Sequence, residues 1–328
     1  MNERRDELGI AMDAVRAASR VCRTVQRNLV TVGTIEKKDR SPVTVADFAS
    51  QAIVCQRLQR SLPGDPVVGE ETAGELRRDE MAALLASVVE HVASELGVEA
   101  TAERVLEWIN RGACEATGGR YWTLDPIDGT KGFLRGEQYA VALGLIENGE
   151  VVLGVLGCPN LPGPGDAPGA LFTAVRGGAA LVLPLWDESG GSGQAIRVAQ
   201  VSCAAGARFC ESVESEHSNQ AGSAQVARLL GITAEPYRLD SQCKYATVAR
   251  GDTSIYLRMP TRKEYREKIW DHAAGKLLVE AAGGTVTDVD GKPLDFHHGR
   301  TLERNRGIVA TCGTIHEEVL EAIQRSSA

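Results

Sequence analysis

Two aspartates three residues apart, Asp125 and Asp128, flank a proline in the segment WTLDPIDGTKGF. Pro126 fixes its own φ and lacks an amide proton, so the segment is stiff and both acids can point the same way. Gly129 and Thr130 follow and offer backbone N–H groups suited to cradling phosphate oxygens. Carboxylates beside such amides indicate a metal-bridged phosphate, although an isolated D-x-x-D-G is more often an Asx-type turn.

Three other segments carry acids in positions that could join this site. Glu70 ends an apolar, strand-like run in VVGEET, Asp271 lies in the first turn of a predicted helix in KIWDHAAG, and Asp47 lies in the first turn of a helix that begins near Thr44. Each has a structural alternative. The Glu pair fits a solvated turn, Asp271 fits a helix cap, and Thr44 with Asp47 fits a capping box.

Hard divalent cations such as Mg²⁺ prefer oxygen ligands, and a site for two of them needs several carboxylates from separate parts of the chain. The segments above supply four predicted ligands, Glu70, Asp125, Asp128 and Asp271. The formal net charge of -8 leaves no general basic surface, which disfavours a protein that grips nucleic acid through many phosphates. An acidic protein that handles an anionic ligand needs local cations, and bound metal is one source.

The elements that position these acids follow from hydrophobic periodicity. Apolar residues between Leu8 and Leu29 recur at helical spacing, and 75–110 indicates polar helices broken at Gly97. Two strand-like runs joined by Asn148-Gly149 predict a hairpin, and LFTAV with AALVLPL predicts another. Beyond the Gly/Ser-rich ESGGSGQ, strands such as TSIYLR and GIVATC alternate with helical stretches, which favours an α/β sheet.

We therefore expect two domains, 1–193 and 194–328, in a chain of 328 residues. Hydrophobic residues make up 43% and charged residues 24%, which is typical of a globular protein with a full core. The eight cysteines form no C-x-x-C pair or regular framework, so we expect reduced thiols. The N-terminus has no apolar run suited to a signal peptide or membrane span, so we expect a cytoplasmic protein. Separately, we expect a monomer.

The motifs GEET, DPIDGT and WDHAAG, in this order and spacing, resemble the three signatures of the inositol monophosphatase superfamily. The similarity extends from the first helix to Gly284. It implies a layered αβαβα sugar-phosphatase fold of the α/β (α+β) class, with the site between two domains. The region 75–116 resembles the family only in being helical, and the Gly- and Pro-rich region 160–194 matches no known motif.

The resemblance also implies roles for individual residues. Glu70 and Asp125 would bind one Mg²⁺ ion with help from the Ile127 carbonyl, and Asp125, Asp128 and Asp271 would bind a second. Asp47 and Thr130 would orient the attacking water, with Asp47 near a possible third ion, and Gly129 and Thr130 would contact the phosphate. Inhibition by lithium is a further expectation from the family.

Within this superfamily the sequence is most similar to the 3'(2'),5'-bisphosphate nucleotidases, through SVESEHS, LDSQCKYATVARG and SIYLR. That similarity implies hydrolysis of the 3'-phosphate of 3'-phosphoadenosine 5'-phosphate to AMP, and leaves open the activated sulfate donor with the same 3'-phosphate. His217, Ser241, Lys244 and Arg258 would hold the nucleotide and its retained phosphate. Taken alone, these four fit a loop residue, a helix cap, a solvated helix residue and an end-of-strand charge.

Two other functions remain open at this point. An inositol polyphosphate 1-phosphatase or inositol monophosphatase would use the same metal site with a different clamp. A catalytically silent nucleotide-binding regulatory protein would keep the scaffold, but loss of at least one ligand acid would be its signature, and all four are present.

Overall fold

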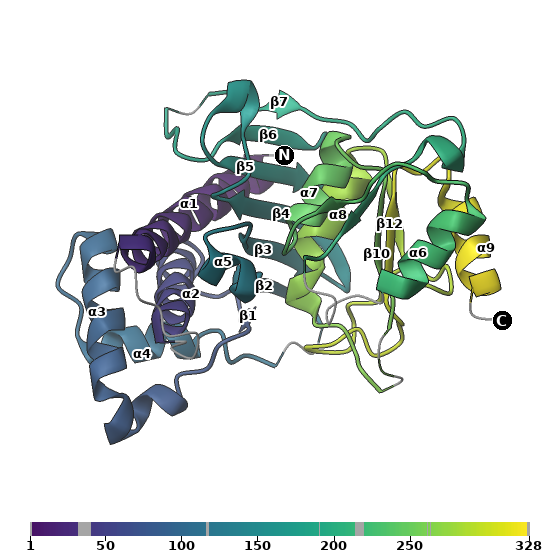
Figure 1. The fold of residues 1–328 in the computed structure, drawn as a ribbon. Helices are drawn as coiled ribbons and strands as arrows, with labels where there is room; N and C mark the ends of the chain where they lie inside the picture. Colours follow the sequence, from purple (N-terminus) through teal and green to yellow (C-terminus); the bar gives the residue numbers. More distant parts are fainter. Residues whose placement is uncertain are drawn as a thin grey trace.

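Two sheets with helices on their faces organise the protein, as Figure 1 shows. The computed structural model describes residues 2–31, 41–115, 118–189, 191–213, 220–260, 262 and 264–326. The first sheet contains, in spatial order, β1 (Val67–Gly69), β2 (Arg120–Asp128), β3 (Ala140–Glu147), β4 (Glu150–Cys158), β5 (Ala170–Val175), β6 (Leu181–Pro184) and β7 (Gln194–Ala195). In it β1 and β2 run parallel, and the pairs from β2 to β7 are antiparallel.

The second sheet lies in the C-terminal part of the chain. Its spatial order is β11 (Thr285–Thr287), β12 (Ile308–Thr311), β10 (Ile255–Arg258), β8 (Phe209–Glu211) and β9 (Tyr237–Arg238). The strand β8 runs parallel to β9 and β10, whereas β12 is antiparallel to both of its neighbours.

Helices complete the layers. The α-helices are α1 (Asn2–Thr31), α2 (Ser41–Ser61), α3 (Ala82–Leu96), α4 (Ala102–Asn110), α5 (Thr130–Arg135), α6 (Gln220–Leu229), α7 (Cys243–Arg250), α8 (Ala273–Ala281) and α9 (His316–Ser326). Short 3-10 helices span Glu75–Arg77, Asp79–Met81, Pro164–Asp166, Ala204–Gly206 and Ile269–Asp271. In the described part of the chain, none of the helices combines the length and apolar character that a membrane crossing needs.

The layer order is helix, sheet, helix, sheet, helix, which confirms the predicted αβαβα architecture. The helices α1 and α2 pack on one face of the first sheet, α7 and α8 lie between the two sheets, and α9 packs on β12 with α6 beside it (Figure 1). Strand β3 shows why both faces must be covered. Its Val141 and Leu143 belong to the core under α1 and α2, whereas Ala140 and Ala142 belong to the core around α7 and α8.

Both predicted hairpins are confirmed. The turn between β3 and β4 has φ of 50° at Asn148 and 74° at Gly149, the positive values that a two-residue hairpin turn requires. The predicted break at Gly97 is also confirmed, because Gly97 ends α3 with φ of 65°. The short helix α7 entered the sequence interpretation only through the helix alternatives for Ser241 and Lys244, and the short edge strand β9 was missed.

The predicted domain boundary at 193/194 falls immediately before β7, the last strand of the first sheet. The second sheet starts with β8 at Phe209. The division into 1–193 and 194–328 therefore stays a proposal, and it would place β7 of the first sheet in the second unit.

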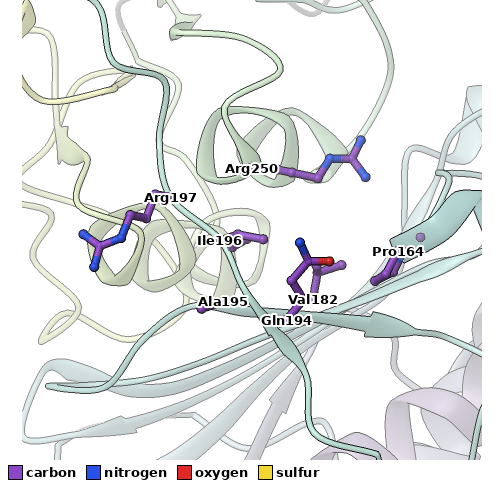
Figure 2. A pocket seen from close by; sticks show the side chains of 8 residues that line it. Pro164, Val182, Gln194, Ala195, Ile196, Arg197 and Arg250 are labelled. Carbon is purple, nitrogen blue, oxygen red and sulfur yellow. The ribbon is translucent and has the colours of Figure 1, made fainter.

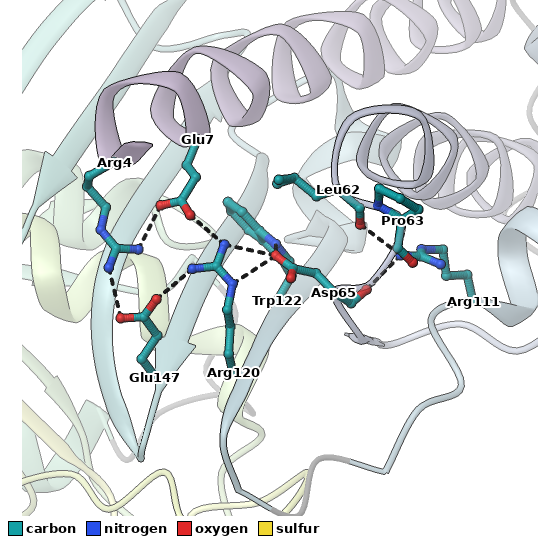
Figure 3. A network of polar contacts seen from close by, with 9 residues as sticks. All are labelled: Arg4, Glu7, Leu62, Pro63, Asp65, Arg111, Arg120, Trp122 and Glu147. Atoms are coloured by element: carbon teal, nitrogen blue, oxygen red, sulfur yellow. Dashed lines mark hydrogen bonds and ion pairs between the residues drawn. The ribbon is translucent and has the colours of Figure 1, made fainter. Parts of the chain in front are cut away.

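A network of arginines and acids fastens the start of α1 to the first sheet (Figure 3). The Arg120 guanidinium on β2 lies 2.6 Å from Glu7, 2.9 Å from Asp65 and 2.6 Å from Glu147. Arg4 contacts both Glu7 and Glu147 at 2.8 Å. Because the Glu7 side chain is only 4% exposed, loss of Arg120 would leave a buried carboxylate with a single partner.

We expect Arg120→Met to lower the free energy of unfolding by about 2 kcal/mol, between the values typical of exposed and buried ion pairs. Urea unfolding of the metal-free protein measures it. Arg176→Met is the matched control, because Arg176 pairs with Glu150 and both side chains are more than half exposed. If Arg176→Met lowered the free energy of unfolding as much as Arg120→Met, a special role for the network would be contradicted.

Candidate active site

The ends of β1 and β2 place two acids side by side. Gly69 pairs with Leu124 in parallel register, so the next residues, Glu70 just past the end of β1 and Asp125 within β2, lie side by side. The Glu70 amide donates to the Leu124 carbonyl at 3.2 Å, and the charge of Glu70 contributes to the raised pKa of the buried Asp125 carboxyl. Two of the four predicted ligands therefore meet as expected.

A bulge in β2 brings the third acid to the same side. Asp125 lies opposite Ala142 of β3, and Asp128 lies opposite Ala140, so three steps along β2 match two along β3. Residues three apart on a regular strand would point to opposite faces, and the irregularity at Pro126 removes this alternation. The charge of Asp128 accordingly contributes to the raised pKa of Asp125.

The Asx-turn alternative holds in part. The Ile127 amide donates to Asp125 Oδ1 at 3.1 Å, which is a local contact of that kind. Asp128 differs, because its Oδ2 accepts a hydrogen bond of 2.6 Å from the amide of Gln242, far along the chain. The two aspartates are therefore held by different parts of the fold.

Asp271 reaches the site from the C-terminal half. The sequence prediction placed it in the first turn of α8, but it ends the 3-10 helix that precedes α8. Arg300 ties this helix to β1, because its guanidinium lies 4.7 Å from the Trp270 ring and donates to the Gly69 carbonyl at 2.6 Å. Asp271 and Glu70 are neighbours of these two anchored residues.

Asp47 approaches from α2. The capping-box alternative is wrong, because α2 begins at Ser41 and Asp47 lies in its second turn, too far along to cap the helix. The Ser50 hydroxyl donates to the Pro126 carbonyl at 2.9 Å, which fixes α2 against the end of β2. Asp47 is buried, and Glu71 and Glu70 contribute to its raised pKa.

The gathered acids raise one another's pKa values. Burial first, and then Asp271, Glu71 and Asp128, raise the pKa of Glu70 to about 8, although the Glu70 side chain keeps an exposed side. Burial and Asp271 raise the pKa of Asp128 to about 6, against the opposing charges of Lys244 and Arg258. The pKa of Asp125 lies well above its ordinary range for the same reasons.

This donor set fits the magnesium that the sequence predicts. Glu70, Asp125, Asp128 and Asp271 come from three elements, offer only carboxylate oxygens, and destabilise one another without a cation. Divalent ions between them would remove the repulsion that raises these pKa values.

A tighter trio of possible ligands is a poorer metal site. Glu267, Asp271 and His272 offer atoms within 4.8 Å of one another in the described residues. However, Glu267 already pairs with Arg258 at 2.8 Å, and His272 Nδ1 is hydrogen-bonded to the Tyr245 hydroxyl at 2.8 Å. A cation there would have to displace a guanidinium, so we assign Glu267 and His272 to support of the site and keep Asp271 as a predicted ligand.

Raised carboxylate pKa values make the folded, metal-free protein bind more protons than the unfolded chain. Its free energy of unfolding therefore falls as pH rises through the raised values, about 6 for Asp128 and about 8 for Glu70. We expect calorimetry with a chelator to show a Tm that decreases across this range, and magnesium to raise Tm most at its alkaline end. A magnesium effect of equal size at both ends would contradict this linkage.

The start of α7 packs against the DPIDGT segment. Gly129 has φ of 91°, and a Cβ at this position would lie 2.8 Å from Ser241 Cβ, so only glycine fits both requirements. Ser241 itself has φ of 66°, a rare conformation for a residue with a side chain, and its hydroxyl accepts from the Cys243 amide at 3.2 Å. This contact to the amide two residues on is a local turn before α7, whose N-cap is Gln242, so the helix-cap alternative for Ser241 is wrong.

Two predicted clamp cations lie beside Asp128, because Lys244 and Arg258 both lower its pKa. Lys244 is only 4% exposed, so the solvated-helix alternative is wrong. Arg258 ends β10 as predicted, but it is paired with Glu267 and Asp271. His217 lies outside the described residues. The roles of Thr130, which begins α5 with an exposed side chain, and of the Ile127 carbonyl stay predictions.

Sequence reasoning missed Gln242, which is 2% exposed and links two parts of the site. Its backbone amide donates to Asp128 Oδ2. Its side-chain Nε2 donates to the Trp270 carbonyl at 2.8 Å, and its side-chain Oε1 accepts from the Gly275 amide at 3.2 Å. Its place between two predicted nucleotide contacts, Ser241 and Lys244, was the only available signal.

A cavity of about 230 Å³ lies apart from these residues, between the 163–164 loop, β6, β7 and the end of α7 (Figure 2). Figure 2 shows Arg197 and Arg250 beside it, but Arg250 is held by Asp252 at 2.5 Å and by the Pro162 carbonyl at 2.6 Å. No predicted site residue lines this cavity.

Several known proteins are similar to this chain over most of its length. The 3'(2'),5'-bisphosphate nucleotidase of Emericella nidulans is 45% identical over 89% of this chain and 90% of its own length. The enzymes of the same name from Schizosaccharomyces pombe and Oryza sativa are each 44% identical, over 96% and 97% of this chain and 94% and 93% of their own.

Solved structures share the fold. An inositol monophosphatase from Anabaena superposes with a TM-score of 0.64 at 22% identity and covers 98% of this chain and 97% of its own. Inositol monophosphatase II from Staphylococcus aureus gives 0.61 at 16% identity, over 95% and 93% of the two chains. The family model described as the inositol monophosphatase family matches residues 3–328. The chain therefore belongs to the inositol monophosphatase family.

Proposed function

We propose that this protein is a magnesium-dependent 3'(2'),5'-bisphosphate nucleotidase that hydrolyses the 3'-phosphate of 3'-phosphoadenosine 5'-phosphate to AMP and phosphate. The observation that carries the proposal is the convergence of Glu70, Asp125, Asp128 and Asp271, with two buried or half-buried cations beside them. Relatives of that name, similar over nearly their whole length, support the choice of substrate.

Glu70, Asp125, Asp128, Asp271 and the Ile127 carbonyl would hold two Mg²⁺ ions, and Asp47 a possible third. Magnesium in this site supplies Lewis-acid stabilisation of phosphoryl oxygens and activates water. Asp47 and Thr130 would orient that water, and the amides of Gly129 and Thr130 would bind phosphate oxygens.

The substrate carries two phosphates, which need different partners. One phosphate reacts among the carboxylates, and the other needs cations that take no part in the reaction. Lys244 and Arg258 suit the second role, because both lie close to Asp128 and are positively charged. Ser241 and His217 would complete the nucleotide pocket.

Turnover of 3'-phosphoadenosine 5'-phosphate, inositol 1,4-bisphosphate and inositol monophosphate, compared with and without magnesium, tests this function. We expect kcat/KM for the nucleotide to exceed kcat/KM for either inositol phosphate by about 100-fold. The reason is that a poorly fitting substrate leaves polar groups of the site without hydrogen-bond partners. Preference for an inositol phosphate would favour the rival phosphatases. Nucleotide binding without turnover would favour a silent regulatory protein. The activated sulfate donor belongs in the same comparison.

We further propose that the protein works as a cytoplasmic monomer. All eight cysteines are free in the structure, as is typical of proteins in a reducing compartment. Sedimentation equilibrium in the presence of magnesium would test the oligomeric state, and a dimer would contradict it.

A further inference from the structure

A buried acid, Glu267, lies behind the predicted phosphate clamp. Glu267 is 3% exposed and lies in the segment between β10 and α8. Its Oε2 is 2.8 Å from Arg258 Nε and 3.2 Å from His272 Nε2. These two partners hold the pKa of Glu267 below its ordinary value despite burial, so it stays ionised.

Glu267 is itself held in place. His272 has no exposed surface, and its Nδ1 is hydrogen-bonded to the Tyr245 hydroxyl at 2.8 Å. The Tyr245 ring is confined in turn, because a Cβ at Gly275 would lie 2.3 Å from it. Side chains from α7, the start of α8 and β10 therefore form one buried chain of hydrogen bonds that ends at Arg258.

The direction of these bonds matters for Arg258. Arg258 Nε donates to the Glu267 carboxylate, while Arg258 Nη2 lies 3.5 Å from Asp271 and 3.3 Å from the Tyr265 hydroxyl. Within the described residues the contacts of Arg258 use Nε and Nη2, which leaves Nη1 to donate to an anion. A guanidinium fixed along one edge offers the remaining donor in a defined direction.

We propose that Glu267, oriented by His272, is a positioning residue that fixes Arg258 to receive the unreacting phosphate, and so sets the preference for a bisphosphate over a monophosphate. This inference rests on the proposed function. Glu267 would also weaken anion binding through its charge, so the two effects oppose each other. If the positioning of Arg258 is the larger effect, removal of the Glu267 side chain weakens binding of the bisphosphate. If the negative charge of Glu267 is the larger effect, its removal strengthens that binding.

The test compares 3'-phosphoadenosine 5'-phosphate with adenosine 3'-monophosphate, which lacks the second phosphate. For Glu267→Leu we expect KM for the bisphosphate to rise about 30-fold, with kcat within about threefold and little change in either constant for the monophosphate. Glu267→Gln keeps an acceptor for Arg258 Nε, so it should recover most of the loss. Tyr245→Phe, which removes one hydroxyl, should raise the same KM about threefold.

Glu280→Leu is the matched control, because Glu280 pairs with Lys276 at 2.7 Å on α8, outside the buried chain. An unchanged ratio between the two substrates in Glu267→Leu, a lower bisphosphate KM, or an equal loss on both substrates would overturn the inference. If Glu267→Leu does not fold, Tyr245→Phe with an unchanged ratio would overturn it too. A wild-type protein without preference for the bisphosphate would instead refute the proposed function.

Discussion

Asp125→Asn is expected to reduce kcat by about a thousandfold or more. Asp125 is 2% exposed, and burial together with Glu70, Asp128, Asp271 and Asp47 raises its pKa, so it interacts with the other three predicted ligands and with Asp47. A shared ligand supports both proposed ions, and metal ions contribute several kcal/mol of transition-state stabilisation, where about 4 kcal/mol is a thousandfold. Steady-state turnover of the nucleotide at saturating magnesium measures the effect.

The same variant should keep its fold without metal. Asparagine has nearly the same shape and removes one repelling charge, so the metal-free Tm should stay equal or rise. Asp79→Asn, in an exposed 3-10 helix, is the control and should leave turnover unchanged. Near-normal turnover in Asp125→Asn would contradict the ligand assignment, whereas a large loss of metal-free stability would show that the residue is structural.

Lys244→Met is expected to raise KM for the bisphosphate by about 30- to 150-fold. The Lys244 ammonium is buried, donates to the Leu239 carbonyl at 3.5 Å and lies 5.3 Å from the Tyr256 ring. Loss of a charge-assisted contact to phosphate costs about 2 to 3 kcal/mol, which corresponds to that change. Methionine fills similar volume, so packing should survive. Lys276→Met on α8 is the control.

A second consequence concerns pH. Lys244 lowers the pKa of Asp128, so its loss should raise that pKa further. Since the ionised form of Asp128 is the proposed metal ligand, the acidic limb of the rate profile should move to higher pH. A raised KM with an unshifted acidic limb would mean that Lys244 binds the phosphate but does not influence the pKa of Asp128. An unchanged KM would refute the clamp.

The sequence predicted those structural features that depend only on residues close together in the chain. The Asn148-Gly149 turn, the break at Gly97 and the stripe along α1 follow from backbone sterics and periodicity, which act within a few residues. The short helix α7 could not be predicted from periodicity, because a helix of this length carries too little of it. Packing against the rest of the protein stabilises α7 instead. The capping interpretation of Asp47 failed because the helix begins at Ser41, before the Thr44 that the pattern suggests.

The sequence by itself determined which acids are present, their oxygen chemistry and the three motifs that assign the family. Only the tertiary structure decided that Asp125 and Asp128 share one side through a bulge, that Gln242 holds Asp128, and that Glu267 lies behind Arg258. The physical reason is that ligand convergence depends on strand register and on contacts between residues far apart in the chain. Neither leaves a periodic trace in the sequence.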